Sequence, residues 1–187
     1  METLRLVVAV SGTPGSGKTT YARFIAERYN LRYVSSGSLF REMAKKLGVD
    51  LIRLHSMAEE NEDIDRAVDS RAIEEAKKGN VVIEGHLAVW LLKDIADVKV
   101  IFDAPLEVRA RRIAQRESIP LEKALEEIKI REKSNYERAR RYYNLDIRDY
   151  TVADLVVNTY PLDVEAVKSV VAAFIDGYLR ARMRIGV

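Results

Sequence analysis

Cysteine is missing from this chain of 187 residues. Its absence excludes disulfide bridges, thiolate-bound zinc and cysteine nucleophiles. Long hydrophobic runs are missing too, because no stretch approaches the roughly 18 consecutive apolar residues of a membrane-spanning helix. The first apolar run, at residues 6–10, is much shorter than the apolar part of a signal peptide with its cleavage site. We therefore expect a soluble, cytoplasmic protein that does not act on a membrane.

A strong excess of charge of either sign is also missing. The chain has 31 lysines and arginines against 29 aspartates and glutamates, a net charge of +2 at pH 7. This balance does not indicate a nucleic-acid-binding protein. The hydrophobic share of 48% is typical of a globular domain, and a chain of this length buries a core of ordinary size. We predict a single domain over residues 1–187 and a monomer.

A glycine-rich segment follows an apolar run at residues 7–10 and precedes a helical pattern from Tyr21. The segment fits G-x-x-x-x-G-K-[ST], the phosphate-binding loop, with Lys18 and Thr19 at its end. Glycines let backbone N–H groups turn inward, and the positive end of the next helix attracts phosphate. Lys18 can reach the outer phosphates, and the Thr19 hydroxyl can coordinate Mg²⁺. The expected nucleotide-binding residues are Gly12, Thr13, Pro14, Gly15, Ser16, Gly17, Lys18, Thr19 and Thr20.

Short apolar segments alternate with helical patterns along the chain. This alternation predicts an α/β fold, a five-stranded parallel sheet with helices on both faces. The expected strands are residues 7–10, 31–35, 81–83, 98–103 and 152–158. The expected helices are residues 21–29, 39–47 with Ser38 as N-cap, 64–78, 87–92, 106–117, 120–143 and 162–183. Residues 49–63 are acidic and less regular, and we expect one short helix and a turn there.

Two broad classes of protein share the phosphate-binding loop: GTPase-type switches, and kinases that phosphorylate a small molecule. The guanine-reading N-K-x-D segment and the D-x-x-G segment of the switches are absent from the sequence. Present instead are GTPGSGKT at 12–19, SGSLFR at 36–41, VVIEGH at 81–86 and DAPLEVR at 103–109. These segments resemble the motifs of nucleoside monophosphate kinases, and most closely those of the single-domain archaeal cytidylate kinases. The resemblance extends over residues 7–159.

The resemblance implies a P-loop NTPase fold with a mobile helical lid over residues 112–143 and an acceptor-binding segment over residues 36–79. It also implies Mg²⁺ and ATP as phosphoryl donor, with Thr19 and Glu84 at the metal. A contact of Arg71 with the acceptor phosphate and a solvated position on a helix face are equally good explanations of this arginine. Asp65 and Asp69 are better explained as surface charges than as groups that recognise the base. The acceptor residues that the resemblance implies are Ser36, Gly37, Arg41, Arg71, Gly85 and His86.

His86 departs from the family pattern, in which an arginine follows this glycine. An imidazole binds phosphate less strongly at neutral pH than a guanidinium does. We hypothesise that His86 contacts the acceptor, so that the KM for the acceptor rises as the pH climbs through about 6.5.

Arginines recur at helical spacing after the fourth expected strand. Arg109, Arg112 and Arg116 share one helix face, and Arg131 and Arg138 lie seven residues apart on the next helix. Such stripes are usually solvated, but the resemblance locates the closing lid here. Guanidinium groups there would neutralise the charge of the transferring phosphoryl group. The expected catalytic residues are Lys18, Arg112, Arg116, Arg131 and Arg138.

The sequence therefore predicts a kinase that moves the γ-phosphoryl group of ATP to CMP, and to dCMP, giving CDP and ADP. Two alternatives remain. The acceptor could be AMP, UMP or a non-nucleotide alcohol. The chain could also be a non-catalytic nucleotide sensor or an assembly ATPase, which would hydrolyse ATP slowly and without an acceptor. All of these have nucleotides as partners, with neither nucleic acid nor membrane.

Overall fold

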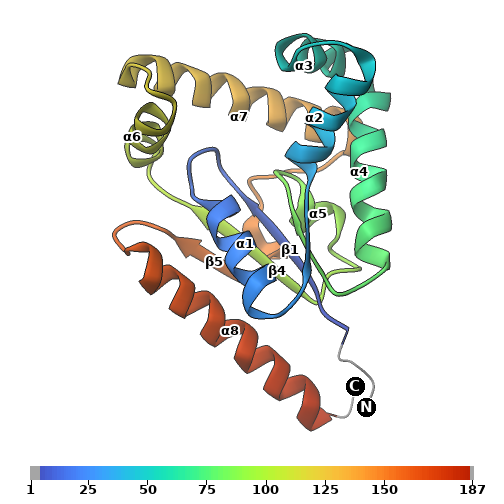
Figure 1. Cartoon of the computed structure of the whole chain (residues 1–187), viewed down its shortest axis with the longest axis vertical. Coiled ribbons are helices and arrows are strands. Elements are labelled where there is room, and N and C mark those ends of the chain that lie inside the picture. The colour runs from blue at the N-terminus through green and yellow to red at the C-terminus, as the bar shows by residue number, and fades with distance from the viewer. Residues whose placement is uncertain (1–4, 186–187) are drawn as a thin grey trace.

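Five strands form one parallel sheet through the centre of the molecule, as predicted (Figure 1). The computed structural model describes residues 5–185, so both ends of the domain expected over residues 1–187 lie outside the described residues. The strand order is β2-β3-β1-β4-β5. The strands are β1 (Val7–Gly12), β2 (Arg32–Ser35), β3 (Val81–Glu84), β4 (Val98–Asp103) and β5 (Leu155–Asn158).

The middle strands β1, β3 and β4 are apolar because helices cover both faces of the sheet. Val8 and Val10 of β1 pack on one face, and Val7 and Ala9 on the other. Since β3 and β4 run parallel to β1, their last residues end at the same edge as the loop that follows β1. This edge of a doubly wound sheet is where ligands bind.

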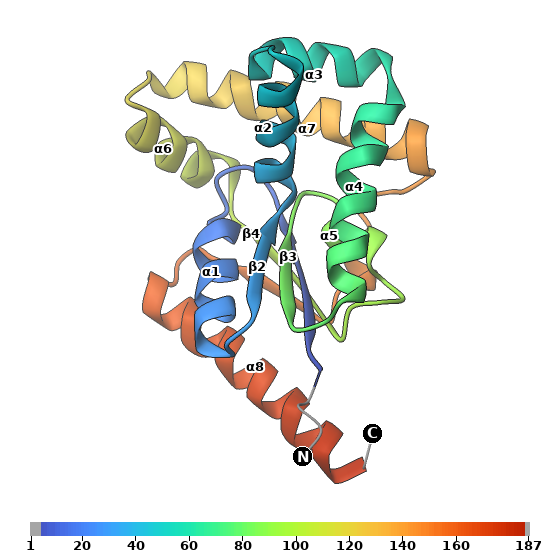
Figure 2. The same ribbon diagram turned by 45° about the vertical axis from the view of Figure 1, so that its right-hand side comes forward.

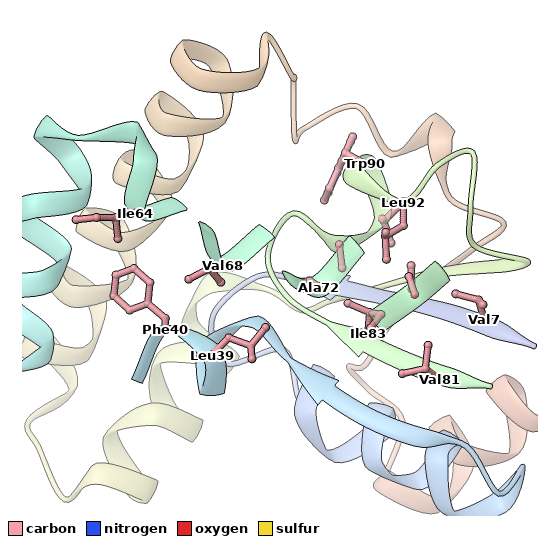
Figure 3. Close-up of a cluster of buried hydrophobic side chains, with 14 of the residues drawn as sticks. Val7, Leu39, Phe40, Ile64, Val68, Ala72, Val81, Ile83, Trp90 and Leu92 are labelled. Atoms are coloured by element: carbon pink, nitrogen blue, oxygen red, sulfur yellow. The ribbon is translucent and has the colours of Figure 1, made fainter. Parts of the chain in front are cut away.

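Eight helices surround the sheet in the described part of the chain. Helices α1 and α8 cover one face, and α4 and α5, with the base of α2, cover the other (Figures 1 and 2). Phe40, Val68, Ile83 and Trp90 belong to the second of these packed layers (Figure 3). The helices are α1 (Lys18–Arg28), α2 (Ser36–Leu47), α3 (Leu51–Glu60), α4 (Glu62–Lys77), α5 (Ala88–Leu91), α6 (Leu106–Glu117), α7 (Leu121–Tyr143) and α8 (Val164–Ile185).

Helix α2 begins earlier than predicted. Ser35, not Ser38, is its N-cap, because the Ser35 hydroxyl accepts a hydrogen bond from the Ser38 N–H at 3.4 Å. The serine-glycine segment thus forms the first turn of α2 and lies directly at the end of β2. The last strand also begins later than predicted, at Leu155, since a short 3₁₀ turn (Tyr150–Val152) precedes it.

The acidic segment after α2 is more regular than predicted. It forms α3, a helix of 10 residues, in place of a short helix and a turn. Asp50 caps α3 by accepting a hydrogen bond from Arg53 N–H at 2.7 Å. Asn61 ends α3 and also caps α4 through Asp63 N–H at 3.0 Å. Asp and Asn are preferred N-cap residues, so Asp50 and Asn61 are signals from which the starts of both helices could have been predicted.

Helices α6 and α7 form a hairpin with a core of its own. That core consists of Ala110, Ile113, Ala124 and Ile128, and the structure groups it apart from the two cores of the sheet. From α6, α7 crosses the carboxyl edge of the sheet toward α3 and α4 (Figures 1 and 2). Within residues 5–185, no helix has both the length and the apolar character that a membrane span requires.

Candidate active site

The loop between β1 and α1 has the backbone that its glycines predict. Gly15 and Gly17 have φ angles of +82° and +90°, a left-handed conformation that side chains with a Cβ rarely adopt. Gly17 is the N-cap of α1, so Lys18 and Thr19 stand in the first turn of that helix. The free N–H groups and the positive end of α1 make this turn suited to phosphate.

Side chains from three other elements hold this loop from outside. They use the hydroxyl of Thr13 and carbonyl oxygens of the loop, and none of them occupies a backbone N–H group of the loop. The bonds join Thr13 to Asp103, Pro14 to Arg109, Gly15 to Arg112 and Ser16 to Thr159, at 2.6, 3.1, 3.4 and 3.0 Å. The loop is therefore fixed in place by the ends of β4 and β5 and by α6.

Lys18 has no hydrogen bond or ion pair with another group among residues 5–185. Burial lowers the pKa of Lys18, and the positive charges of Arg131, Arg116 and Arg109 lower it further, while Glu84 opposes them. The Glu84 carboxylate is 5% exposed and accepts a hydrogen bond from the Tyr33 hydroxyl at 2.8 Å. Lys18 is half-buried, and an ammonium group without a hydrogen-bond partner at the start of a helix is suited to bind an anion.

The predicted acceptor residues gather near the end of β3, with the exception of Arg71. Gly85 packs against Ser36, because a Cβ at Gly85 would lie 2.6 Å from Ser36 Oγ. Arg41 is exposed and donates a hydrogen bond to Ser38 Oγ at 2.9 Å, so it lies beside this junction. Arg71 instead pairs with Glu42 at 3.2 Å on the outer surface of α2 and α4.

Two carboxylates that the sequence suggested were surface charges are buried. Asp65 and Asp69 of α4 are only 8% and 7% exposed. Arg138 Nη1 of α7 donates to both oxygens of Asp65, at 2.8 and 2.9 Å. The Tyr143 hydroxyl donates to Asp69 at 2.6 Å, and burial raises the pKa of Asp69 to about 6. The expectation of surface charge was wrong, because α7 covers this polar face of α4.

Comparison of the sequence with known proteins identifies the family of this chain. The sequence profile of the Cytidylate kinase-like family matches residues 7–160. The chain belongs to that family. It is 53% identical to the cytidylate kinase of Pyrobaculum islandicum over 159 residues, 85% of this chain and 86% of the relative. It is 45% identical to that of Staphylothermus marinus over 94% of this chain and 99% of the relative.

The fold is also that of more distant kinases. Shikimate kinase of Aquifex aeolicus superposes with a TM-score of 0.62 at 20% identity, over 92% of this chain and 97% of that one. The resemblance to archaeal cytidylate kinases and the P-loop fold inferred from the sequence are therefore confirmed.

The four arginines expected in the lid lie in three different environments of this cytidylate kinase-like chain. Arg131 and Arg138 are on α7, and both lower the pKa of His86 through their charge. Arg112 of α6 donates to Thr159 Oγ1 and O at 2.9 and 3.1 Å, behind the phosphate-binding loop. Arg116 is exposed on α6 and pairs with Glu117 at 2.6 Å.

A cavity of about 230 Å³ lies between the start of the phosphate-binding loop and α7. His86, Trp90, Tyr136 and Tyr150 line it, together with residues 12–14 of the loop. Trp90 reads from sequence as a core residue of its helix, and it is 6% exposed, with its indole N–H donating to Asp149 O at 3.0 Å. No local pattern around Trp90 indicates that its side chain also borders a cavity.

His86 is expected to remain neutral between pH 5 and 8, because burial and the charges of Arg138, Lys18 and Arg131 lower its pKa to about 3. With this pKa, His86 would not titrate near pH 6.5 in the ligand-free protein, so the KM for the acceptor is not expected to rise there. Contact of His86 with the acceptor stays a prediction, because a neutral imidazole can still donate one hydrogen bond. Between the pKa of the folded chain and the usual value near 6.5, the unfolded chain binds more protons. His86 should therefore lower the free energy of unfolding as the pH falls below about 6.5.

NMR titration of the imidazole signals measures this pKa. A His55→Asn variant assigns the two histidines, of which His55 also has a pKa lowered by burial. A midpoint for His86 near pH 6.5 in the ligand-free protein would contradict the prediction.

Proposed function

We propose that this chain transfers the γ-phosphoryl group of ATP to CMP, and to dCMP, giving CDP and ADP. One observation carries the proposal. An anion-binding loop, in which Lys18 has no hydrogen-bond partner within the part of the chain that the structure describes, lies close to arginines of α7 whose charges act on Lys18 and on His86. The names of relatives at 45–53% identity support cytidine as the base. The proposed unit is one monomeric domain, with acceptor segment 36–79 and lid 112–143.

In the donor half, backbone N–H groups of the loop and of the first turn of α1, within residues 12–20, hold the ATP phosphates together with the Lys18 ammonium. The Thr19 hydroxyl and the buried Glu84 carboxylate fit Mg²⁺, which prefers oxygen ligands and keeps several waters. When bound, Mg²⁺ would neutralise charge on the outer phosphates. Lys18 adds a positive charge where negative charge develops, and the low solvent exposure strengthens that interaction.

In the acceptor half, the monophosphate binds near the junction of β2, β3 and α2. Ser36, Gly37, Arg41, Gly85 and His86 are the proposed contacts, with Arg71 at the margin. Arg112, Arg116, Arg131 and Arg138 form the proposed lid set. Arg138 is suited to this role because its Nε–H is buried and has no hydrogen-bond partner. Closure of α7 would exclude water, and hydrolysis is the competing reaction.

A panel of monophosphates at saturating ATP tests the proposal. We expect kcat/KM for CMP to exceed that for UMP by at least about tenfold, because cytosine and uracil exchange a donor for an acceptor. A mismatched buried polar group costs about 1–3 kcal/mol, and about 1.4 kcal/mol is tenfold. ADP formation is measured with CMP, dCMP, UMP and AMP. Equal or higher kcat/KM with UMP or AMP would assign a different acceptor.

The same assay separates a kinase from an ATPase that only binds nucleotide. A kinase forms ADP in proportion to the acceptor, and Arg131→Ala should lower its turnover because the charge lies near Lys18. An ATPase would form ADP slowly without an acceptor, and Arg131→Ala would leave that rate nearly unchanged.

A further inference from the structure

Arg109 is outside the proposed set of catalytic and substrate-binding residues, yet its side chain joins three parts of the site. The residue is in α6 and is 6% exposed. Its Nε donates to Ala104 O at 2.8 Å, at the end of β4. Its Nη1 donates to Pro14 O of the phosphate-binding loop at 3.1 Å and to Glu132 Oε1 of α7 at 2.7 Å. One guanidinium thus bonds to the sheet edge, the loop and the helix that crosses above them.

The Glu132 bond matters because α7 has few other ties to the loop. The α6–α7 hairpin packs on its own small core, and the Asp65–Arg138 pair joins the far half of α7 to α4. Glu132 is next to Arg131, whose charge reaches Lys18, and it borders the cavity beside residues 12–14. The position of Glu132 therefore determines how Arg131 stands relative to the loop.

We propose that Arg109 and Glu132 are positioning residues for phosphoryl transfer. Their ion pair fixes α7 at one distance above the phosphate-binding loop, so that the charge of Arg131 acts on Lys18. The inference rests on the proposed kinase function. The side chains of Arg109 and Glu132 are 8% and 36% exposed, so the pair is shielded from solvent mainly on the arginine side. Without Glu132, Arg109 would still bond to two carbonyl oxygens, so the loop should keep its shape while α7 loses its anchor.

The test compares Glu132→Ala with Glu137→Gln, which removes the charge of another glutamate on the same helix. Glu137 is half exposed and only 3.9 Å from its partner, Lys133. Steady-state assays give kcat and KM for both substrates, and thermal unfolding reports the fold. Trp90 is the only tryptophan in the chain and lines the same cavity as Glu132, so its fluorescence reports the position of α7.

We expect Glu132→Ala to lower kcat by about 10- to 100-fold, since misplacing a catalytic group by about 1 Å has effects of that size. The KM for ATP should change less than about threefold, because the loop keeps its contacts with phosphate. Trp90 emission should move to longer wavelength and become more accessible to acrylamide. Glu132→Asp, which keeps the charge, should recover part of the kcat, and Glu137→Gln should match the parent protein.

Three results would overturn the inference. The first is a kcat within twofold of the parent with unchanged Trp90 emission. The second is a loss of kcat that follows a large drop in unfolding temperature, which indicates a structural role only. The third is an increase in the KM for ATP without a change in kcat. If the parent protein itself shows no acceptor-dependent turnover, the proposed function fails, and the Trp90 measurement still decides whether Glu132 anchors α7.

Discussion

Replacing Lys18 with methionine is expected to lower kcat/KM by at least about 10³-fold while the protein stays folded. Removal of one preorganised donor from the region of developing charge typically costs about 10²- to 10³-fold, and a full positive charge on a transferring phosphoryl group more. Lys18 has no hydrogen bond or ion pair to lose among the described residues. Since burial lowers its pKa, the folded state disfavours its charge, and Lys18→Met should leave the unfolding temperature equal or higher.

Initial rates with CMP and calorimetric unfolding measure the two effects. Lys129→Met is the matched control, because Lys129 is an exposed lysine of α7. The control should leave both quantities unchanged. A Lys18→Met variant with a kcat/KM within tenfold of the parent would contradict the role of Lys18 in charge neutralisation.

Replacing Arg138 with leucine is expected to lower the free energy of unfolding by about 3–5 kcal/mol at pH 7. Removing one partner of a buried ion pair has effects of that size, because it leaves the other charge buried and uncompensated. Asp65 would then stand unpaired beside Asp69, whose pKa burial already raises to about 6. Burial also raises the pKa of Asp65.

The destabilisation should depend on pH in a defined direction. Without Arg138, the folded pKa of Asp65 lies further above its unfolded value, so a proton binds the folded state preferentially. The loss in stability should therefore be smaller at pH 5 than at pH 7, as measured by urea unfolding. The double variant Asp65→Asn, Arg138→Leu should recover most of the loss. Lys133→Ala, which breaks an exposed pair on the same helix, should cost less than about 1 kcal/mol.

The phosphate-binding loop and the sheet could be predicted because their requirements are local. Gly15 and Gly17 are needed for positive φ angles, and that need is visible in a stretch of eight residues. The strands β1, β3 and β4 are buried on both faces, so their apolar runs identify them without knowledge of their neighbours. Helix α3 was underestimated because the acidic residues lie at its two ends, whereas its buried side carries Leu54 and Ala58 and its N-cap is Asp50.

The contacts that join the two halves of the site could not be predicted. Arg138 and Asp65 are 73 residues apart, and Arg109 and Pro14 are 95 apart. From the sequence alone, each arginine is explained equally well as a solvated residue on a helix surface, because its partner lies so far away along the chain. The lowered pKa of His86 arises from burial and from charges on α1 and α7, so no local pattern contains it.

The separate core of the α6–α7 hairpin makes this hairpin an exchangeable unit of the kinase. Substitutions among Ala110, Ile113, Ala124 and Ile128 alter the cohesion of the hairpin without repacking the sheet. A chimaera could therefore carry the hairpin of another P-loop kinase on this sheet. The graft would have to preserve the Arg109 contacts to Pro14 and Ala104 and supply a partner for Asp65. Divergence within the family can accordingly proceed at different rates in the hairpin and in the sheet with its phosphate-binding loop.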